Sequence, residues 1–158
     1  MKKINKFNSA RMHGFTLVEL LVVIGILAIL TAVVLVAVNP GRQLQQARNT
    51  ERRAEVNTVL AAITAFLADP DNTDTLPAVQ LCSVGPVAVY ADATAVAPDV
   101  NLSIVAPIYV AALPEDPTTG GVDLGDTGYE ICLADATNQR YRVSAPAAEG
   151  GITVEVER

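Results

Sequence analysis

Several residue types that enzymes depend on are scarce in this 158-residue chain. Its only histidine is His13, and its lysines occur only at positions 2, 3 and 6. Serine nucleophiles are activated by a neighbouring histidine or lysine, and the sequence beyond residue 13 supplies neither. No glycine-rich phosphate-binding loop is found either. We therefore expect a protein that is not an enzyme and that carries no cofactor.

Cysteine and aromatic residues are also few. The chain has no tryptophan and only seven Phe and Tyr residues, so its folded part can bury only a small core. Two cysteines, Cys82 and Cys132, do not complete a zinc site without two carboxylate partners. In an exported domain the same pair predicts a disulfide. Closing a loop of about 50 residues would stabilise the domain by about 4 kcal/mol in the chain-entropy model.

Charge is distributed unevenly along the chain. Its first 14 residues are basic and contain no acid, and residues 42–55 carry four arginines against two glutamates. From residue 68 onward there are 14 acidic residues and only three arginines. This acidic part repels phosphate, so we expect no nucleic-acid partner. The acidic surface either keeps a folded head soluble or meets the basic segments of neighbouring copies.

The longest apolar run occupies residues 15–38, and Glu19 is its only charge. As an α-helix it would be about 36 Å long, which is enough to cross a hydrocarbon core of about 30 Å. The basic residues before it predict a cytoplasmic N-terminus and a head outside the cytoplasmic membrane. The run is longer than the apolar region of a secretory signal, and no small-residue cleavage site follows it.

The junction at Gly14, where a short basic leader meets Phe15-Thr16-Leu17-Val18-Glu19, resembles the N-terminus of type IV prepilins and pseudopilins. The resemblance implies cleavage after Gly14 and N-methylation of Phe15 by a prepilin peptidase/methyltransferase. It also implies that Glu19 pairs with the amino group of Phe15 on an adjacent subunit, since two opposite buried charges are tolerated where one is costly. The alternative is an interfacial acid without a role. Identical subunits and an inner-membrane assembly platform are the other expected partners.

The resemblance and the residue pattern together predict an α+β fold. A long N-terminal helix, transmembrane in its first half and amphipathic in its second, would pack on a small C-terminal antiparallel sheet. Pro40 would break this helix, either as a plain membrane exit or as a kink. The second half, at 43–67, would present an apolar face and two ion pairs, Arg48–Glu51 and Arg52–Glu55. That face comprises Val56, Val59, Leu60, Ile63 and Leu67.

Beyond the helix, the expected elements are a short strand at Val87–Tyr90, a short helical segment at Leu102–Leu113, and a meander of three strands. The meander strands are predicted at Tyr129–Leu133, Arg140–Val143 and Ile152–Val156. The predicted organisation is a leader at 1–14, a transmembrane and assembly helix at 15–38, an amphipathic stalk helix at 39–68, and an extracytoplasmic head at 69–158.

A calcium site is a further hypothesis. Asp116, Asp123 and Asp126 lie in a glycine-rich stretch, and carboxylate oxygens suit Ca²⁺. Major pseudopilins, which this chain resembles, bind calcium in a loop of the C-terminal region, and the stretch Leu113–Pro117 resembles their L-P-x-D-P segment. The leading prediction of function is a structural subunit of a type IV pilus on the cell surface. The alternatives are a major pseudopilin of a type II secretion system or a competence-type pseudopilus, and a monomeric membrane-anchored binding protein.

Overall fold

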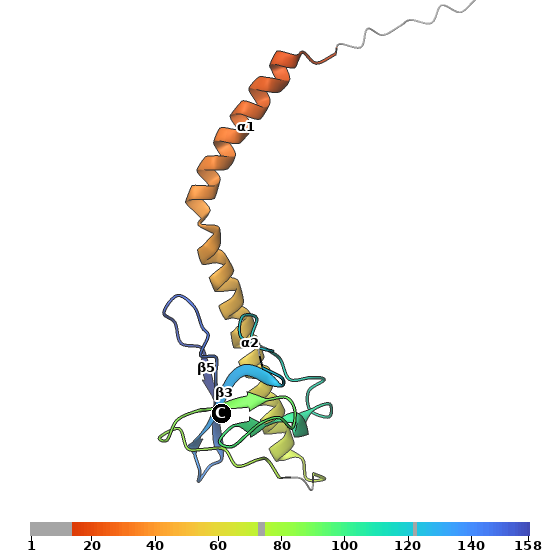
Figure 1. Cartoon of the computed structure of the whole chain (residues 1–158), viewed down its shortest axis with the longest axis vertical. Coiled ribbons are helices and arrows are strands. Elements are labelled where there is room, and N and C mark those ends of the chain that lie inside the picture. The colour runs from red at the N-terminus through yellow and green to blue at the C-terminus, as the bar shows by residue number, and fades with distance from the viewer. Residues whose placement is uncertain (1–13, 73–74, 122) are drawn as a thin grey trace, which may run out of the picture. The chain divides into compact units, whose positions relative to one another are not determined.

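The computed structural model describes residues 14–72, 75–121 and 123–158, which divide into two compact units at Pro40/Gly41. The first unit contains helix α1 (Leu17–Val38). The second contains nearly all of helix α2 (Pro40–Ala68) and a five-stranded sheet. Figure 1 shows α1 in red to orange, α2 in orange to yellow, and the strands in green to blue. The α+β fold class is confirmed.

Helix α1 is apolar on every side. All of its 22 residues are exposed within the chain, and Glu19 is its only charged residue. A helix that is hydrophobic all round belongs inside a larger apolar environment, either a membrane or a bundle of similar helices. By length and composition α1 is long and apolar enough to cross a membrane.

The two helices are separated by a single residue, Asn39. Its backbone is left-handed, with φ 45° and ψ 78°, which asparagine tolerates better than most residues. The break therefore lies one residue before the predicted Pro40, which instead opens α2. Proline is favoured at the first position of a helix because it needs no hydrogen-bond partner for its nitrogen. Helix α2 ends at Ala68, two residues before Pro70, as predicted.

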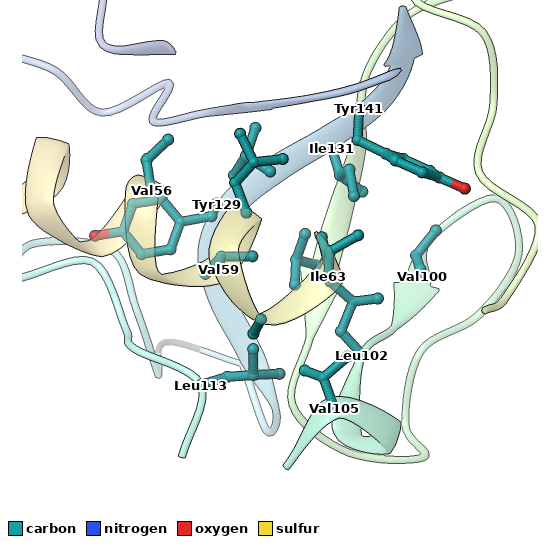
Figure 2. Close-up of a cluster of buried hydrophobic side chains, with 14 of the residues drawn as sticks. Val56, Val59, Ile63, Val100, Leu102, Val105, Leu113, Tyr129, Ile131 and Tyr141 are labelled. Carbon is teal, nitrogen blue, oxygen red and sulfur yellow. The ribbon is translucent and has the colours of Figure 1, made fainter. Parts of the chain in front are cut away.

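The core lies between one face of α2 and one face of the sheet. Figure 2 shows α2 side chains, among them Val56, Val59 and Ile63, facing Tyr129 and Ile131 of the sheet. Four of the five predicted apolar positions on α2 are buried, but Leu67 is 38% exposed and Phe66 takes its place. Phe66 packs edge-on against Tyr109, with ring centroids 5.5 Å apart.

The sheet has the strand order β2-β1-β3-β4-β5. Central strand β3 (Asp126–Asp135) pairs antiparallel with β1 (Val87–Tyr90) and with β4 (Arg140–Ser144). Strand β5 (Glu155–Glu157) continues the meander beyond β4, and β2 (Val100–Asn101) pairs parallel with β1. The predicted meander is present, but the sheet is mixed and larger than the three antiparallel strands expected.

One predicted element beyond the helix is wrong, and the last predicted strand is displaced. The stretch Leu102–Leu113 contains only a single 3-10 turn, η1 (Ser103–Val105), because Pro107 has no N–H to continue a helix. The last strand starts at Glu155 rather than at Ile152. Two successive left-handed glycines, Gly150 and Gly151, widen the connection after β4, so the chain rejoins the sheet later.

Candidate functional site

The N-terminus of α1 is closed by a capping box between Thr16 and Glu19. The Glu19 backbone N–H donates to the Thr16 hydroxyl oxygen at 3.2 Å, and the Thr16 backbone N–H donates to Glu19 Oε2 at 2.9 Å. The Thr16 hydroxyl also donates to Oε2, at 2.7 Å. Free N–H groups at a helix start need such acceptors, and a carboxylate there also offsets the helix dipole.

This geometry fixes the Glu19 carboxylate beside the predicted cleavage point. Both Thr16 bonds reach Oε2, and no bond within the described part of the chain engages Oε1. Phe15, one residue before the cap, is 81% exposed. An amino group created at Phe15 would therefore lie next to a preorganised acceptor, with one carboxylate oxygen available to a cation from another chain.

A second cluster joins α2 to the loop after β4. The Arg48 guanidinium donates from Nε and Nη2 to the two oxygens of Glu149, at 2.7 and 2.8 Å. The Asn49 amide donates to the Glu149 carbonyl oxygen at 2.8 Å and accepts from the Glu149 backbone N–H at 3.0 Å. The hydrogen bonds from Arg48 lower the pKa of Glu149, although burial by itself would raise it. These contacts hold the loop against the N-terminal half of α2.

A buried ion pair joins α2 to the loop before β3. Arg52 and Asp116 side chains are both fully buried, and Arg52 Nε and Nη2 donate to the two Asp116 oxygens at 2.6 and 3.1 Å. Asp116 also accepts from the Thr118 hydroxyl and from the Thr118 and Thr119 backbone N–H groups. Burial by itself would raise the pKa of Asp116, but these donors hold it far below its usual range.

The predicted ion pairs of α2 are wrong. Arg48 pairs with Glu149 rather than Glu51, and Arg52 pairs with Asp116 rather than Glu55. Glu55 instead accepts a short hydrogen bond from the Tyr129 hydroxyl. Burial and the adjacent Glu55 carboxylate raise the pKa of Tyr129 above its usual range. The carboxylates that pair with these arginines belong to loops far away in the sequence. The i to i+3 spacing of charges along α2 could not indicate such partners.

The structure pairs one of the three predicted calcium ligands, Asp116, with Arg52, whereas Asp123 and Asp126 lie near Tyr90. Asp116 faces Arg52 inside the core, whereas Asp126 accepts from the Gly128 N–H at the start of β3 and Asp123 is exposed. Among the residues that the structure describes, no three His, Cys, Asp or Glu side chains form a group that could hold a metal. Because both Asp116 oxygens are occupied by Arg52, the predicted set receives no support as a calcium site.

Four acidic residues lie near Tyr90. Burial raises the pKa of Tyr90, and the nearby carboxylates raise it further; they belong to Asp126, Asp99, Asp123 and Asp92. Within the described ranges, none of these carboxylates takes part in an ion pair. We use the name acidic face for these four residues below.

Cys82 and Cys132 are joined by a disulfide. Residues 80–82 run beside the end of β3 at this point. The Cys82 N–H donates to the Leu133 carbonyl oxygen, and the Leu133 N–H donates to the Gln80 carbonyl oxygen. The disulfide therefore fixes the loop before β1 to the central strand.

The N-terminal part of the chain matches a known family model. The family model described as the prokaryotic N-terminal methylation motif matches residues 9–35, which include Arg11, Gly14, the capping box and most of α1. Neither the curated proteins nor the solved structures gave a significant match. The chain therefore carries a prepilin-type methylation signal followed by one apolar helix that fits a single-pass anchor, which supports a type IV pilin or pseudopilin.

Proposed function

We propose that this chain is a structural subunit of a type IV pilus, assembled after its leader is removed and Phe15 is methylated. The observation that carries the proposal is the position of the methylation motif directly on α1. Signal and helix overlap, so cleavage after Gly14 would leave an apolar helix at the extreme N-terminus. A secretory signal would instead be lost with its apolar segment.

The exposed surface of α1 supports polymerisation through this helix. Every residue of α1 is exposed within the chain, so the helix needs lipid or other helices around it. Once subunits leave the bilayer, packing the α1 helices of many copies together would remove this apolar area from water. Each buried methylene group contributes about 0.8 kcal/mol to such packing.

The capping box supports a role for Glu19 in aligning the subunits. Thr16 holds Glu19 Oε2, and Oε1 is then directed to the amino group of Phe15 on an adjacent copy. Cleavage creates this cation from a neutral amide, so the pairing requires processing. A buried carboxylate without a partner is costly, which would favour the register that pairs each Glu19 with an amine.

Electron microscopy of sheared surface material tests the proposal. The full chain, expressed in cells that assemble it, should give filaments that disappear when Gly14→Val blocks cleavage. Asn5→Ala is a matched control, because it also lies in the leader but leaves the residues on both sides of the predicted cleavage point unchanged. Loss of the leader with no polymer of any length would contradict the proposal and would favour a monomeric anchored protein.

A second candidate is a major pseudopilin of a secretion system. It is favoured by the segment Leu113–Pro117, whose Asp116 forms the buried ion pair with Arg52. A pseudopilin would give filaments that do not extend beyond the envelope, and its deletion would stop the export of other proteins. Long surface filaments with unchanged protein export would favour the pilus.

A further inference from the structure

A polar groove lies between the N-terminal half of α2 and the loop at 149–152. Its volume is about 460 Å³. Hydrogen-bond donors dominate its lining on the α2 side, from Arg42, Gln45, Gln46 and Arg53. The loop side contributes Glu149. Guanidinium and amide groups arranged in this way suit a ligand that bears carboxylate oxygens.

The groove is fixed in shape before any partner arrives. The Asn49 side chain, only 5% exposed, forms hydrogen bonds with both the backbone N–H and the carbonyl oxygen of Glu149. Arg48 donates to both oxygens of the Glu149 carboxylate. The left-handed Gly150 and Gly151 then turn the chain at the groove wall. A preformed site loses less entropy on binding than a flexible one.

The charge of the groove is positive. Arg48 neutralises Glu149, the one acid in the lining, so the Arg53 cation gives the groove an excess of positive charge. Arg53 is exposed, and its guanidinium takes part in no ion pair within the described ranges. Arg53 is thus the cation in this groove that is best placed to receive an acid from outside the chain.

We infer that this groove receives carboxylates from the head of a second copy of the chain, an inference that rests on the proposed function. The part of the chain after residue 67 has 14 acidic residues against three arginines, and the four carboxylates of the acidic face have no cationic partner among the described residues. The acidic face of one copy therefore complements the groove of another. Anionic lipid is a weaker match, because so acidic a head is repelled by a negatively charged membrane surface.

An unusual feature of the composition provides the test. Residues 15–158 contain no lysine, so Arg53→Lys creates the only side-chain amine in a processed chain while it keeps the positive charge. Filaments of this variant are treated with a carbodiimide, which joins an amine directly to a carboxylate in contact with it. Arg158→Lys, which places the same amine outside the groove, is the matched control, and wild-type filaments give the background.

We expect a new cross-linked dimer from Arg53→Lys filaments, in several-fold higher yield than from Arg158→Lys filaments. In this dimer, position 53 should be joined to an acidic-face residue of the second copy. Arg53→Glu should lower filament yield several-fold, whereas Arg158→Glu should not. Filaments that form normally with no cross-link between position 53 and a second copy would overturn the inference. So would an Arg53→Glu effect confined to membrane retention of unassembled chains, which would indicate lipid. Absence of polymer from wild-type chains would instead contradict the proposed function.

Discussion

Replacing Asp116 by asparagine tests the buried ion pair that joins α2 to the loop before β3. The Asp116 side chain is fully buried and accepts two bonds from Arg52 and three from Thr118 and Thr119. Asparagine has nearly the same shape and keeps one carbonyl oxygen for the Thr118 and Thr119 donors. Its NH₂ group would face Arg52 Nε–H, so two donors would meet, and the guanidinium would lose its buried counterion and keep only the more distant Glu149 carboxylate, 3.7 Å from Nη1.

The expected loss of stability is large for a single conservative substitution. Breaking a buried ion pair by removing one partner costs about 3–5 kcal/mol, because the remaining charge is buried without compensation. Domains of this size have a total free energy of unfolding of about 5–15 kcal/mol. With a urea m-value of about 2 kcal/mol per M, the Asp116→Asn midpoint should fall by roughly 2 M.

Near-UV circular dichroism of the full chain in detergent measures this change. All four tyrosines lie between residues 90 and 141, so their signal reports on the second unit and not on α1. Asp71→Asn is the matched control, because Asp71 is exposed and its loss should cost less than about 0.5 kcal/mol. The double variant Arg52→Met/Asp116→Asn should recover part of the loss, since it removes the stranded charge. Equal midpoints for Asp116→Asn and Asp71→Asn would refute the reasoning.

Three further predictions concern acid, the disulfide and the capping box. The folded-state pKa of Asp116 lies far below its unfolded value of about 3.9, so its contribution to stability is complete above about pH 5 and is lost as the pH falls further. Urea midpoints measured against pH should show this loss of stability in the wild-type chain. An equal acid dependence in Asp116→Asn would contradict the prediction. Reduction of Cys82–Cys132 should slow migration in a denaturing gel and lower the free energy of unfolding by up to about 4 kcal/mol, while two free thiols in exported protein would disprove the bond. Glu19→Ala should leave membrane insertion intact, as followed by fractionation, but reduce or misalign filaments; normal filaments from this variant would exclude the pairing role.

Local patterns made much of the fold predictable. The apolar run and the alternation of buried side chains on β3 and β4 are properties of neighbouring residues, so α1 and the first two strands of the meander were predicted correctly. Strand β2 was missed because only two residues form it, and their parallel pairing with β1 depends on a distant segment.

Long-range partners explain most of what the sequence did not reveal in the site. Arg52 pairs with Asp116, which is 64 residues away in the sequence, and Arg48 pairs with Glu149, which is 101 residues away. The spacing of charges along α2 therefore suggested the wrong pairs. The capping box is different. Thr16 and Glu19 are three residues apart at the start of an apolar run, a signature that the sequence displays and that was overlooked.

The intact mass of the chain recovered from the cell envelope shows whether the leader is removed and Phe15 is methylated. The account predicts a protein that begins at Phe15 and is one methyl group heavier than residues 15–158, with the modification on the Phe15 nitrogen. Protein that functions normally in the envelope and still carries residues 1–14 would contradict it.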